Sequence, residues 1–202
     1  PSITDSSTYT FLKSETMKEL FESEIEGCFL YSRHWNPSNK YLSDAISALE
    51  NSEASQITSS GISAIACAIL QICQKGDQII SSRTIYGGTY ALFKNVLPKF
   101  GISVKFVDIL DLSIVSKSIT SKTKMVYCES ISNPLLDVSD LPELSKITKK
   151  NSIKLVVDNT FSPMSITPIN HGADIVIHSL TKFINGTSDC VAGSISSTKD
   201  FI

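Results

Sequence analysis

Lys182 is the most reactive side chain that the sequence places beside the end of a predicted strand. It lies within the segment 179–186, directly after the largely apolar run that ends at His178. A solvated surface charge is the ordinary interpretation of such a lysine. Between hydroxyl residues and at the edge of a sheet, however, a desolvated amine can act as a nucleophile. Lys182 is therefore a candidate for covalent chemistry.

Acidic residues close three of the predicted strands, at Asp108, Glu129 and Asp158. Such acids can simply form turns or cap helices. That interpretation is favoured for Asp108, because residues 111–112 begin a predicted helix next to it. Asp158 differs, because it follows an apolar strand and no helical pattern comes after it. Asp158 is thus a second candidate for chemistry.

Two further segments could bind a phosphate or a flat ring. Ser60 and Gly61 precede a clear helical pattern, and a helix N-terminus offers free backbone N–H groups and a positive dipole end. Considered alone, this segment is more simply a serine N-cap. Tyr86 lies on a glycine-containing loop from which its ring could stack on a ligand, although a plain turn is the alternative. The sequence has neither a GxxxxGK[ST] nor a GxGxxG pattern.

Together these residue types match the needs of one cofactor, pyridoxal 5'-phosphate. That cofactor requires a lysine for its Schiff base and a carboxylate for its pyridinium nitrogen. It also requires a phosphate-binding helix end with hydroxyl groups, and an aromatic neighbour. Lys182 would supply the amine, Asp158 the carboxylate and Tyr86 the aromatic neighbour. The candidate phosphate ligands are Ser60, Gly61, Ser179 and Thr181.

The elements that must position these residues alternate along the chain. Hydrophobic periodicity predicts helices at 41–49, 62–73, 90–100, 112–119 and 141–150. It predicts strands at 77–81, 103–108, 124–129, 154–158, 173–178 and 191–195. This alternation predicts an α/β domain over residues 41–202, with a mostly parallel sheet covered by helices. Residues 1–40, with an amphipathic stretch near 13–26, are expected to form an N-terminal arm. Ligands of such sheets bind beyond the carboxyl ends of the strands.

The composition excludes several classes of function. The net charge of −2 argues against a dedicated nucleic-acid binder, which needs a basic face. The longest apolar stretch, residues 65–73, is far too short to span a membrane. The five cysteines are odd in number and irregularly spaced, which favours reduced thiols in the cytoplasm and no metal site. Only Arg33 and Arg83 are arginines, so each is a candidate for an anion contact.

Seven ordered segments together resemble the trans-sulfuration (Cys/Met metabolism) family of fold-type I pyridoxal-phosphate enzymes. They run from Tyr31 to Gly193 and comprise 31–33 with 36–37, 59–61, 86–90, 129 with 132–134, 157–160, 172–174, and 178–182 with 185–186. The resemblance implies the aspartate aminotransferase-like large domain, with a seven-stranded type of sheet, and pyridoxal 5'-phosphate as the cofactor. Gly88 stands where well-known methionine γ-lyases carry a cysteine.

The resemblance also implies roles for individual residues. Lys182 would form the Schiff base and shuttle protons, and Asp158 would keep the ring nitrogen protonated. Tyr86 would stack on the ring and assist proton transfer. The implied phosphate and cofactor contacts are Ser60, Gly61, Ile62, Thr160, Ser179 and Thr181, with Tyr31 and Arg33 reaching into a neighbouring subunit. The implied contacts near the substrate are Asn133 and Glu129.

The family resemblance implies a carbon–sulfur lyase that acts on methionine or cystathionine and releases a 2-oxo acid, ammonia and a thiol. The alternative is γ-replacement, as in O-acetylhomoserine sulfhydrylase or cystathionine γ-synthase. A fold-type I aminotransferase or decarboxylase is less favoured. Catalytic dimers that form a homotetramer are implied, with an amino acid as the substrate. The chain ends twenty positions after Lys182, so we expect it to hold the arm and most of the cofactor domain, without the C-terminal domain.

Overall fold

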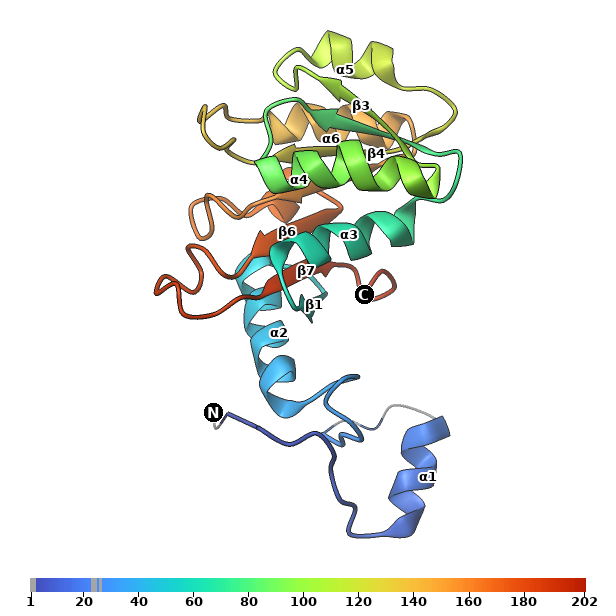
Figure 1. Cartoon of the computed structure of the whole chain (residues 1–202), viewed down its shortest axis with the longest axis vertical. Helices are drawn as coiled ribbons and strands as arrows, with labels where there is room; N and C mark the ends of the chain where they lie inside the picture. Colours follow the sequence, from blue (N-terminus) through green and yellow to red (C-terminus); the bar gives the residue numbers. More distant parts are fainter. Residues whose placement is uncertain (1–2, 23–24, 26) are drawn as a thin grey trace. The chain divides into compact units, whose positions relative to one another are not determined.

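The computed structural model describes residues 3–22, 25 and 27–202. These fall into two units, one ending at Ala45 and one running from Ile46 to Ile202. The helices are α1 (Ser14–Glu22), α2 (Pro37–Glu50), α3 (Gly61–Ile72), α4 (Gly87–Ala91), α5 (Leu112–Ser118) and α6 (Leu141–Lys150). The strands are β1 (Ala54–Thr58), β2 (Gln78–Ser82), β3 (Ser103–Val107), β4 (Thr123–Glu129), β5 (Lys154–Asp158), β6 (Ile175–Ser179) and β7 (Gly193–Ser197) (Figure 1).

The first unit contains α1, which has no buried residue. The amphipathic stretch predicted near 13–26 is thus a helix over 14–22, while residues 23, 24 and 26 lie outside the described residues. Two segments of this unit pair through an antiparallel bridge between Thr8 and Tyr31. The Ser32 N–H extends the pairing by donating to the Ser7 carbonyl at 2.9 Å.

The second unit is built on a seven-stranded sheet in the order β1-β7-β6-β5-β4-β2-β3. Strands β6, β5, β4, β2 and β3 are parallel neighbours, whereas β7 is antiparallel to both β6 and β1. The predicted mostly parallel sheet is therefore confirmed. Strand β1 was not predicted, because its segment ASQIT carries a single large apolar residue and pairs only with β7 at the edge.

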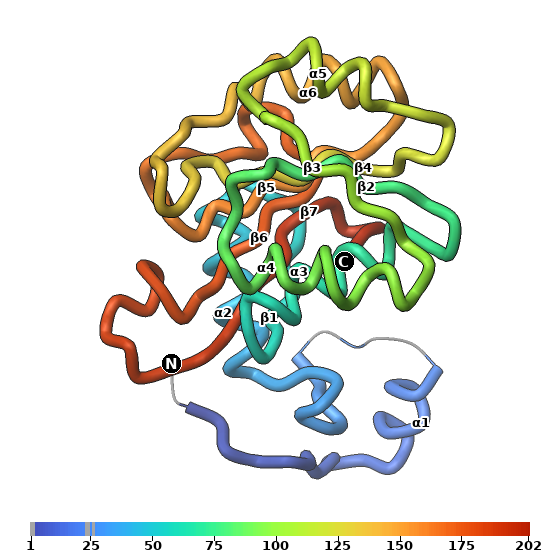
Figure 2. Tube along the Cα trace, turned by 45° about the horizontal axis from the view of Figure 1, so that its top comes forward, coloured from blue at the N-terminus to red at the C-terminus, as the bar shows by residue number. Residues whose placement is uncertain are grey.

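Each face of the sheet has its own apolar core. Along β5, Val156 packs into one core and Val157 into the other, because successive side chains of a strand point to opposite faces. Residues of α3 pack into the first core together with Phe93 and Leu97 from the helical turns that continue α4, and residues of α5 and α6 pack into the second. Figure 2 shows these two helix pairs on either side of the strands. A residue at the end of a strand therefore faces α3 and α4 when its side chain points to the same face of the sheet as that of Val156.

The helix predicted at 90–100 differs from the observed one in its start and its winding. It begins earlier, at Gly87, continues from α4 into a π-helical turn at Leu92–Val96, and closes with a 3₁₀ turn at Leu97–Phe100. Gly101, with φ of +75°, ends it in the left-handed conformation that glycine adopts without strain. Among the described residues, no helix is both long and apolar enough to cross a membrane.

Candidate active site

Glu129 and Asp158 lie side by side at the carboxyl edge of the sheet. They are the last residues of β4 and β5, and the parallel register of these strands pairs them directly. Both are in step with Val156 and therefore face the side of α3 and α4. Both are largely buried, with 7% of Glu129 and 8% of Asp158 exposed. The sheet thus places two carboxyl groups where parallel sheets bind ligands.

Two hydrogen-bond donors hold the Asp158 carboxylate in place. Its Oδ2 accepts from the Tyr127 hydroxyl at 3.0 Å, and its Oδ1 accepts from the Thr160 N–H at 3.0 Å. Burial raises the pKa of Tyr127 well above its usual range, and the charges of Asp158 and Glu129 raise it further. Tyr127 therefore stays a neutral phenol that donates to Asp158 throughout the physiological pH range.

Both oxygens of the Glu129 carboxylate accept backbone hydrogen bonds. Oε1 accepts from the Tyr86 N–H at 2.6 Å, and Oε2 accepts from the Asn133 N–H at 3.1 Å. The pKa of Glu129 is raised to about 7, chiefly because burial disfavours its charged form. The hydrogen bond from Tyr86 opposes this rise, and the neighbouring Asp158 charge adds to it. The assignment of Glu129 and Asn133 to substrate binding stays a prediction.

Tyr86 stands at the start of α4 with about half of its side chain exposed. Its ring lies against the backbone of Gly88, where an added β-carbon would come within 2.6 Å of the Tyr86 Cε1 atom. The ring packs this closely because position 88 carries no side chain. Tyr86 is consequently held by Glu129 through its backbone, while its ring stays open to solvent.

The start of α3 meets the end of β6 at very close range. A β-carbon on Gly61 would lie 2.6 Å from the Ser179 β-carbon. The helix N-terminus, with its free N–H groups at Gly61 and Ile62, therefore lies directly beside Ser179. Ser60 acts as the N-cap: its Oγ accepts from the Ser63 N–H at 3.1 Å, as the simpler interpretation of this segment supposed.

The remaining predicted contacts lie on the segments after β5 and β6. The Ser179 N–H donates to the Thr160 Oγ1 at 2.7 Å, which ties the two strand ends together. The Thr181 Oγ1 accepts from the Ala192 N–H at 3.0 Å and donates to its carbonyl at 3.2 Å. Lys182 is exposed, and its amine has no hydrogen-bond or ion-pair partner among the described residues. Its side chain is thus free to bind a ligand.

Tyr31 and Arg33 belong to the first unit, where they contact each other. The Arg33 guanidinium carbon lies 5.2 Å from the centre of the Tyr31 ring, a cation–π distance. The Tyr31 side chain is 37% exposed. The two residues therefore form one compact basic and aromatic group within their own unit. Their predicted contact with a neighbouring subunit stays a prediction.

A buried polar cluster that was not predicted from the sequence lies on the opposite face of the sheet. The His178 Nε2 lies 2.6 Å from the Glu50 Oε1, and neither side chain is more than 1% exposed. The Asn159 amide donates to the same Glu50 oxygen at 3.3 Å. Asn159 directly follows Asp158, and His178 directly precedes Ser179. The cluster therefore supports both strand ends from behind. The signal in the sequence was Glu50, an acidic residue that stands at the helical spacing of the buried positions of α2.

We expect Glu50→Ala to lower the free energy of unfolding by roughly 3–5 kcal/mol, because it leaves a buried imidazole without its partner. Urea unfolding with an unchanged m-value measures this. Glu143→Ala serves as the control, since its ion pair with Lys146 is exposed and screened by solvent, so its loss should change the free energy of unfolding little. Equal stability of the two variants would show that the Glu50–His178 contact is unimportant.

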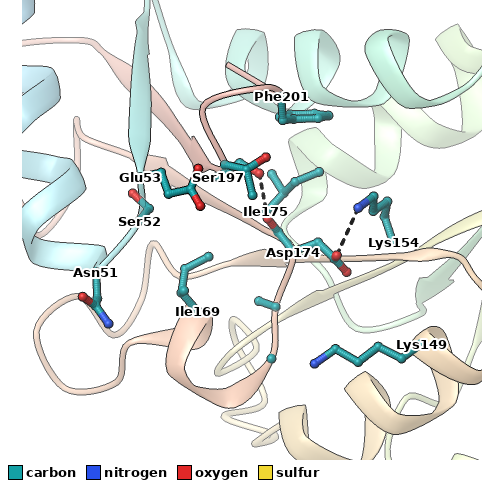
Figure 3. A pocket seen from close by; sticks show the side chains of 13 residues that line it. Asn51, Ser52, Glu53, Lys149, Lys154, Ile169, Asp174, Ile175, Ser197 and Phe201 are labelled. Atoms are coloured by element: carbon teal, nitrogen blue, oxygen red, sulfur yellow. Dashed lines mark hydrogen bonds and ion pairs between the residues drawn. The ribbon is translucent and has the colours of Figure 1, made fainter.

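A pocket of about 320 Å³ opens at the other end of the strands (Figure 3). Lys154 and Ile175, which begin β5 and β6, line it together with Lys149 and Asp174. The Lys154 amine lies 3.2 Å from the Asp174 carboxylate. This pocket is at the amino edge of the sheet and contains none of the predicted site residues. Glu129, Asp158 and Ser179 lie instead at the opposite, carboxyl edge.

Comparisons with known proteins identify relatives of the chain in sequence. The chain is 41% identical to a methionine gamma-lyase of Arabidopsis thaliana over 206 residues, and 40% identical to an O-acetyl-L-homoserine sulfhydrylase of Leptospira meyeri over 189 residues. These matches cover 100% and 93% of the chain but only 47% and 42% of the relatives. The chain thus spans about half the length of the curated relatives it matches.

Solved structures have the same fold. A Campylobacter jejuni structure, described as an O-acetylhomoserine (thiol)-lyase with N'-pyridoxyl-lysine-5'-monophosphate, has a TM-score of 0.93 at 31% identity, covering 100% of this chain and 50% of that one. The cystathionine gamma-lyase of Lactobacillus plantarum in complex with L-serine has a TM-score of 0.86 at 31% identity, covering 96% and 49%.

A family model described as "Cys/Met metabolism PLP-dependent enzyme" matches residues 1–201. Its match extends over both units of the structure, and the expected fold-type I architecture is confirmed by the solved neighbours. Because this model matches nearly the whole chain and the relatives match it in sequence, the chain belongs to the Cys/Met metabolism family of PLP-dependent enzymes.

Proposed function

We propose that this chain is the cofactor-binding part of an enzyme that cleaves carbon–sulfur bonds in sulfur amino acids. The reaction would be γ-elimination of methionine or cystathionine, giving a 2-oxo acid, ammonia and a thiol. The observation that carries the proposal is the convergence at one sheet edge of a buried carboxylate, a helix N-terminus and a lysine whose amine has no partner in the part of the chain that the structure describes. The methionine gamma-lyases among the relatives support the choice of substrate class.

The residues at this edge fit pyridoxal 5'-phosphate. Its ring nitrogen needs a carboxylate shielded from water, and Asp158 is 8% exposed and held by two donors. Its phosphate needs N–H groups without a side chain in front of them, and α3 begins with Gly61, packed against Ser179. Its aldehyde needs an uncommitted amine, which Lys182 offers. The chemistry of the donor set therefore suits every part of the cofactor.

When bound, the cofactor supplies an electron sink for negative charge at the substrate α-carbon. Asp158 would hold a proton on the ring nitrogen, because a fixed negative charge favours the protonated form. The Lys182 amine would remove the α-proton from the substrate and return protons later in the reaction. Tyr86 would cover one face of the ring, and its phenol would assist proton transfer.

The phosphate would be held by N–H groups and hydroxyls together. Gly61 and Ile62 would donate backbone N–H groups from the positive end of α3. Ser179 would donate its hydroxyl, with Thr160 fixing its backbone. Thr181 would have to turn its hydroxyl away from Ala192 to take part. Ser60 can keep its capping bond, but its hydroxyl would have to turn away from the Ser63 Oγ, to which it donates at 3.2 Å, in order to reach the phosphate.

We further propose that the enzyme works as a homotetramer of catalytic dimers in the cytoplasm. Tyr31 and Arg33 would reach the phosphate of a neighbouring subunit, with Arg33 as the charged contact. An exposed basic and aromatic pair suits this role. All five cysteines are free thiols in the structure, which supports a reducing compartment.

A second candidate reaction is γ-replacement on an activated homoserine. The relatives support this alternative, since an O-acetyl-L-homoserine sulfhydrylase matches at 40% identity and a cystathionine gamma-synthase at 36%, close to the lyases. In that reaction a thiol or sulfide would add where the γ-group has left. The same residues of this chain would serve both reactions.

A substrate comparison on the complete, cofactor-loaded enzyme tests the proposed function. Methionine, cystathionine and O-acetylhomoserine are offered with and without sulfide, and 2-oxo acid, ammonia and homocysteine are measured. We expect 2-oxo acid and ammonia from methionine or cystathionine without sulfide. Homocysteine formed only from O-acetylhomoserine plus sulfide would assign the enzyme to γ-replacement. Turnover that requires a 2-oxo acid acceptor would identify an aminotransferase and contradict both.

A further inference from the structure

One carboxylate connects two loops at the edge of the site. Glu129 ends β4, and its two oxygens accept the N–H of Tyr86, which precedes α4, and the N–H of Asn133, in the loop between β4 and α6. These residues are 43 and 4 positions away from Glu129 in the chain. Since Glu129 is 7% exposed, water competes little for either hydrogen bond.

The loop that carries Asn133 is closed by its own hydrogen bonds. The Ser132 N–H donates to the Asp137 carbonyl at 2.9 Å, and the Ser139 hydroxyl donates to the Glu129 carbonyl at 2.7 Å. The loop therefore keeps its internal shape and is joined to the Tyr86 segment through the Glu129 side chain. Removing that side chain would separate the two segments without opening the loop.

We propose that Glu129 is a positioning residue, whose carboxylate clamps the backbones of Tyr86 and Asn133 together beside Asp158. The inference rests on the proposed function, in which Tyr86 covers the cofactor ring. It differs from the predicted role of Glu129 as a substrate contact, because both carboxylate oxygens are already occupied by backbone donors. Glu129 acts on the reaction only through the residues it holds.

The clamp depends on the charge of Glu129. The ionisable groups that face it are Asp158 on β5 and the phenol of Tyr127 on its own strand, while α4 and the β4–α6 loop present backbone N–H groups. With its pKa at about 7, Glu129 loses its charge below neutral pH, and a protonated oxygen no longer accepts as strongly. The two amides should therefore be held more firmly at pH 8 than at pH 6.

Amide hydrogen exchange of the complete protein measures the clamp without relying on turnover. The protection factors of Tyr86 and Asn133 are compared between pH 6 and pH 8 in the wild type, Glu129→Gln and the control Glu143→Gln. The glutamine keeps the size but has one acceptor oxygen, so at least one amide should lose roughly tenfold to a hundredfold protection at pH 8. Exchange in β4 and β5 verifies that the variant is folded.

A second variant, Glu129→Asp, separates the effect of the carboxyl charge from the effect of the side-chain length. Glu129→Asp keeps a titratable carboxyl but is one methylene shorter, so it cannot span both donors. It should lose protection at one amide and retain a pH dependence at the other. Glu143, which lies on α6 with an exposed side chain, should behave as the wild type when changed to glutamine. Unchanged protection at both amides in Glu129→Gln would overturn the proposal.

Turnover of the loaded enzyme provides the second readout. Glu129→Gln should lower kcat/KM roughly tenfold at pH 8 and remove the fall in activity below pH 7 that we expect of the wild type. A raised KM with unchanged amide protection would instead make Glu129 a substrate ligand and refute the clamp. If the wild type fails to cleave any sulfur amino acid, the proposed function fails, while the exchange data still decide whether the clamp exists.

Discussion

Replacing Lys182 with alanine should reduce turnover by roughly a thousandfold or more. The amine has two tasks in the proposed reaction, to bond to the cofactor and to move the α-proton, and loss of a nucleophile or a general base each costs several orders of magnitude. The structure leaves the amine exposed and without a partner among the described residues. Little stability should be lost with it, so the effect would be chemical.

The absorption spectrum of the loaded protein measures the Lys182→Ala result independently of the substrate. A cofactor bound through a Schiff base absorbs visible light, and the variant should lose that band while its fold persists. Lys117→Ala is the matched control, since Lys117 is an exposed lysine on α5, on the other side of the sheet. If the variant keeps the wild-type spectrum, another lysine bonds to the cofactor and the assignment of Lys182 is wrong.

Replacing Asp158 with asparagine should lower kcat by roughly a hundredfold or more while leaving substrate binding within a few-fold. The neutral amide cannot favour a proton on the ring nitrogen as a carboxylate does, so negative charge at the substrate α-carbon is less stabilised. The buried setting strengthens this effect, because a charge interaction in a low dielectric is larger than in water. Steady-state kcat and KM of the complete enzyme measure it.

The Asp158→Asn substitution also changes the hydrogen bonds around this residue, so the experiment needs a control for stability. Tyr127 and Thr160 both donate to the carboxylate, and the amide of asparagine can accept from only one of them. Thermal unfolding must therefore accompany the kinetics, so that lost stability is separated from lost chemistry. Asp200→Asn, at an exposed turn, should leave both unchanged. Near-normal kcat in a folded Asp158→Asn variant would exclude Asp158 as the partner of the ring nitrogen.

Much of the fold was predictable because its signals are local. The predicted bounds of β5 and α6 coincide with those in the structure, since an apolar strand and a helix with strong amphipathic periodicity each carry their own pattern. The strand β1 was not predicted, because its segment ASQIT is a strand through its pairing with β7. The π-helical turn after α4 had no pattern in the sequence either.

The sequence by itself determined the family, the α/β class and the set of chemically suited residues, because residue types and their order along the chain are enough for these. Only the tertiary structure decided which of them meet. The parallel register of β4 and β5 joins Glu129 to Asp158, and strand alternation sends His178 to the opposite face, where it pairs with Glu50. Contacts between residues as far apart as 128 positions depend on topology and packing, which no local pattern records.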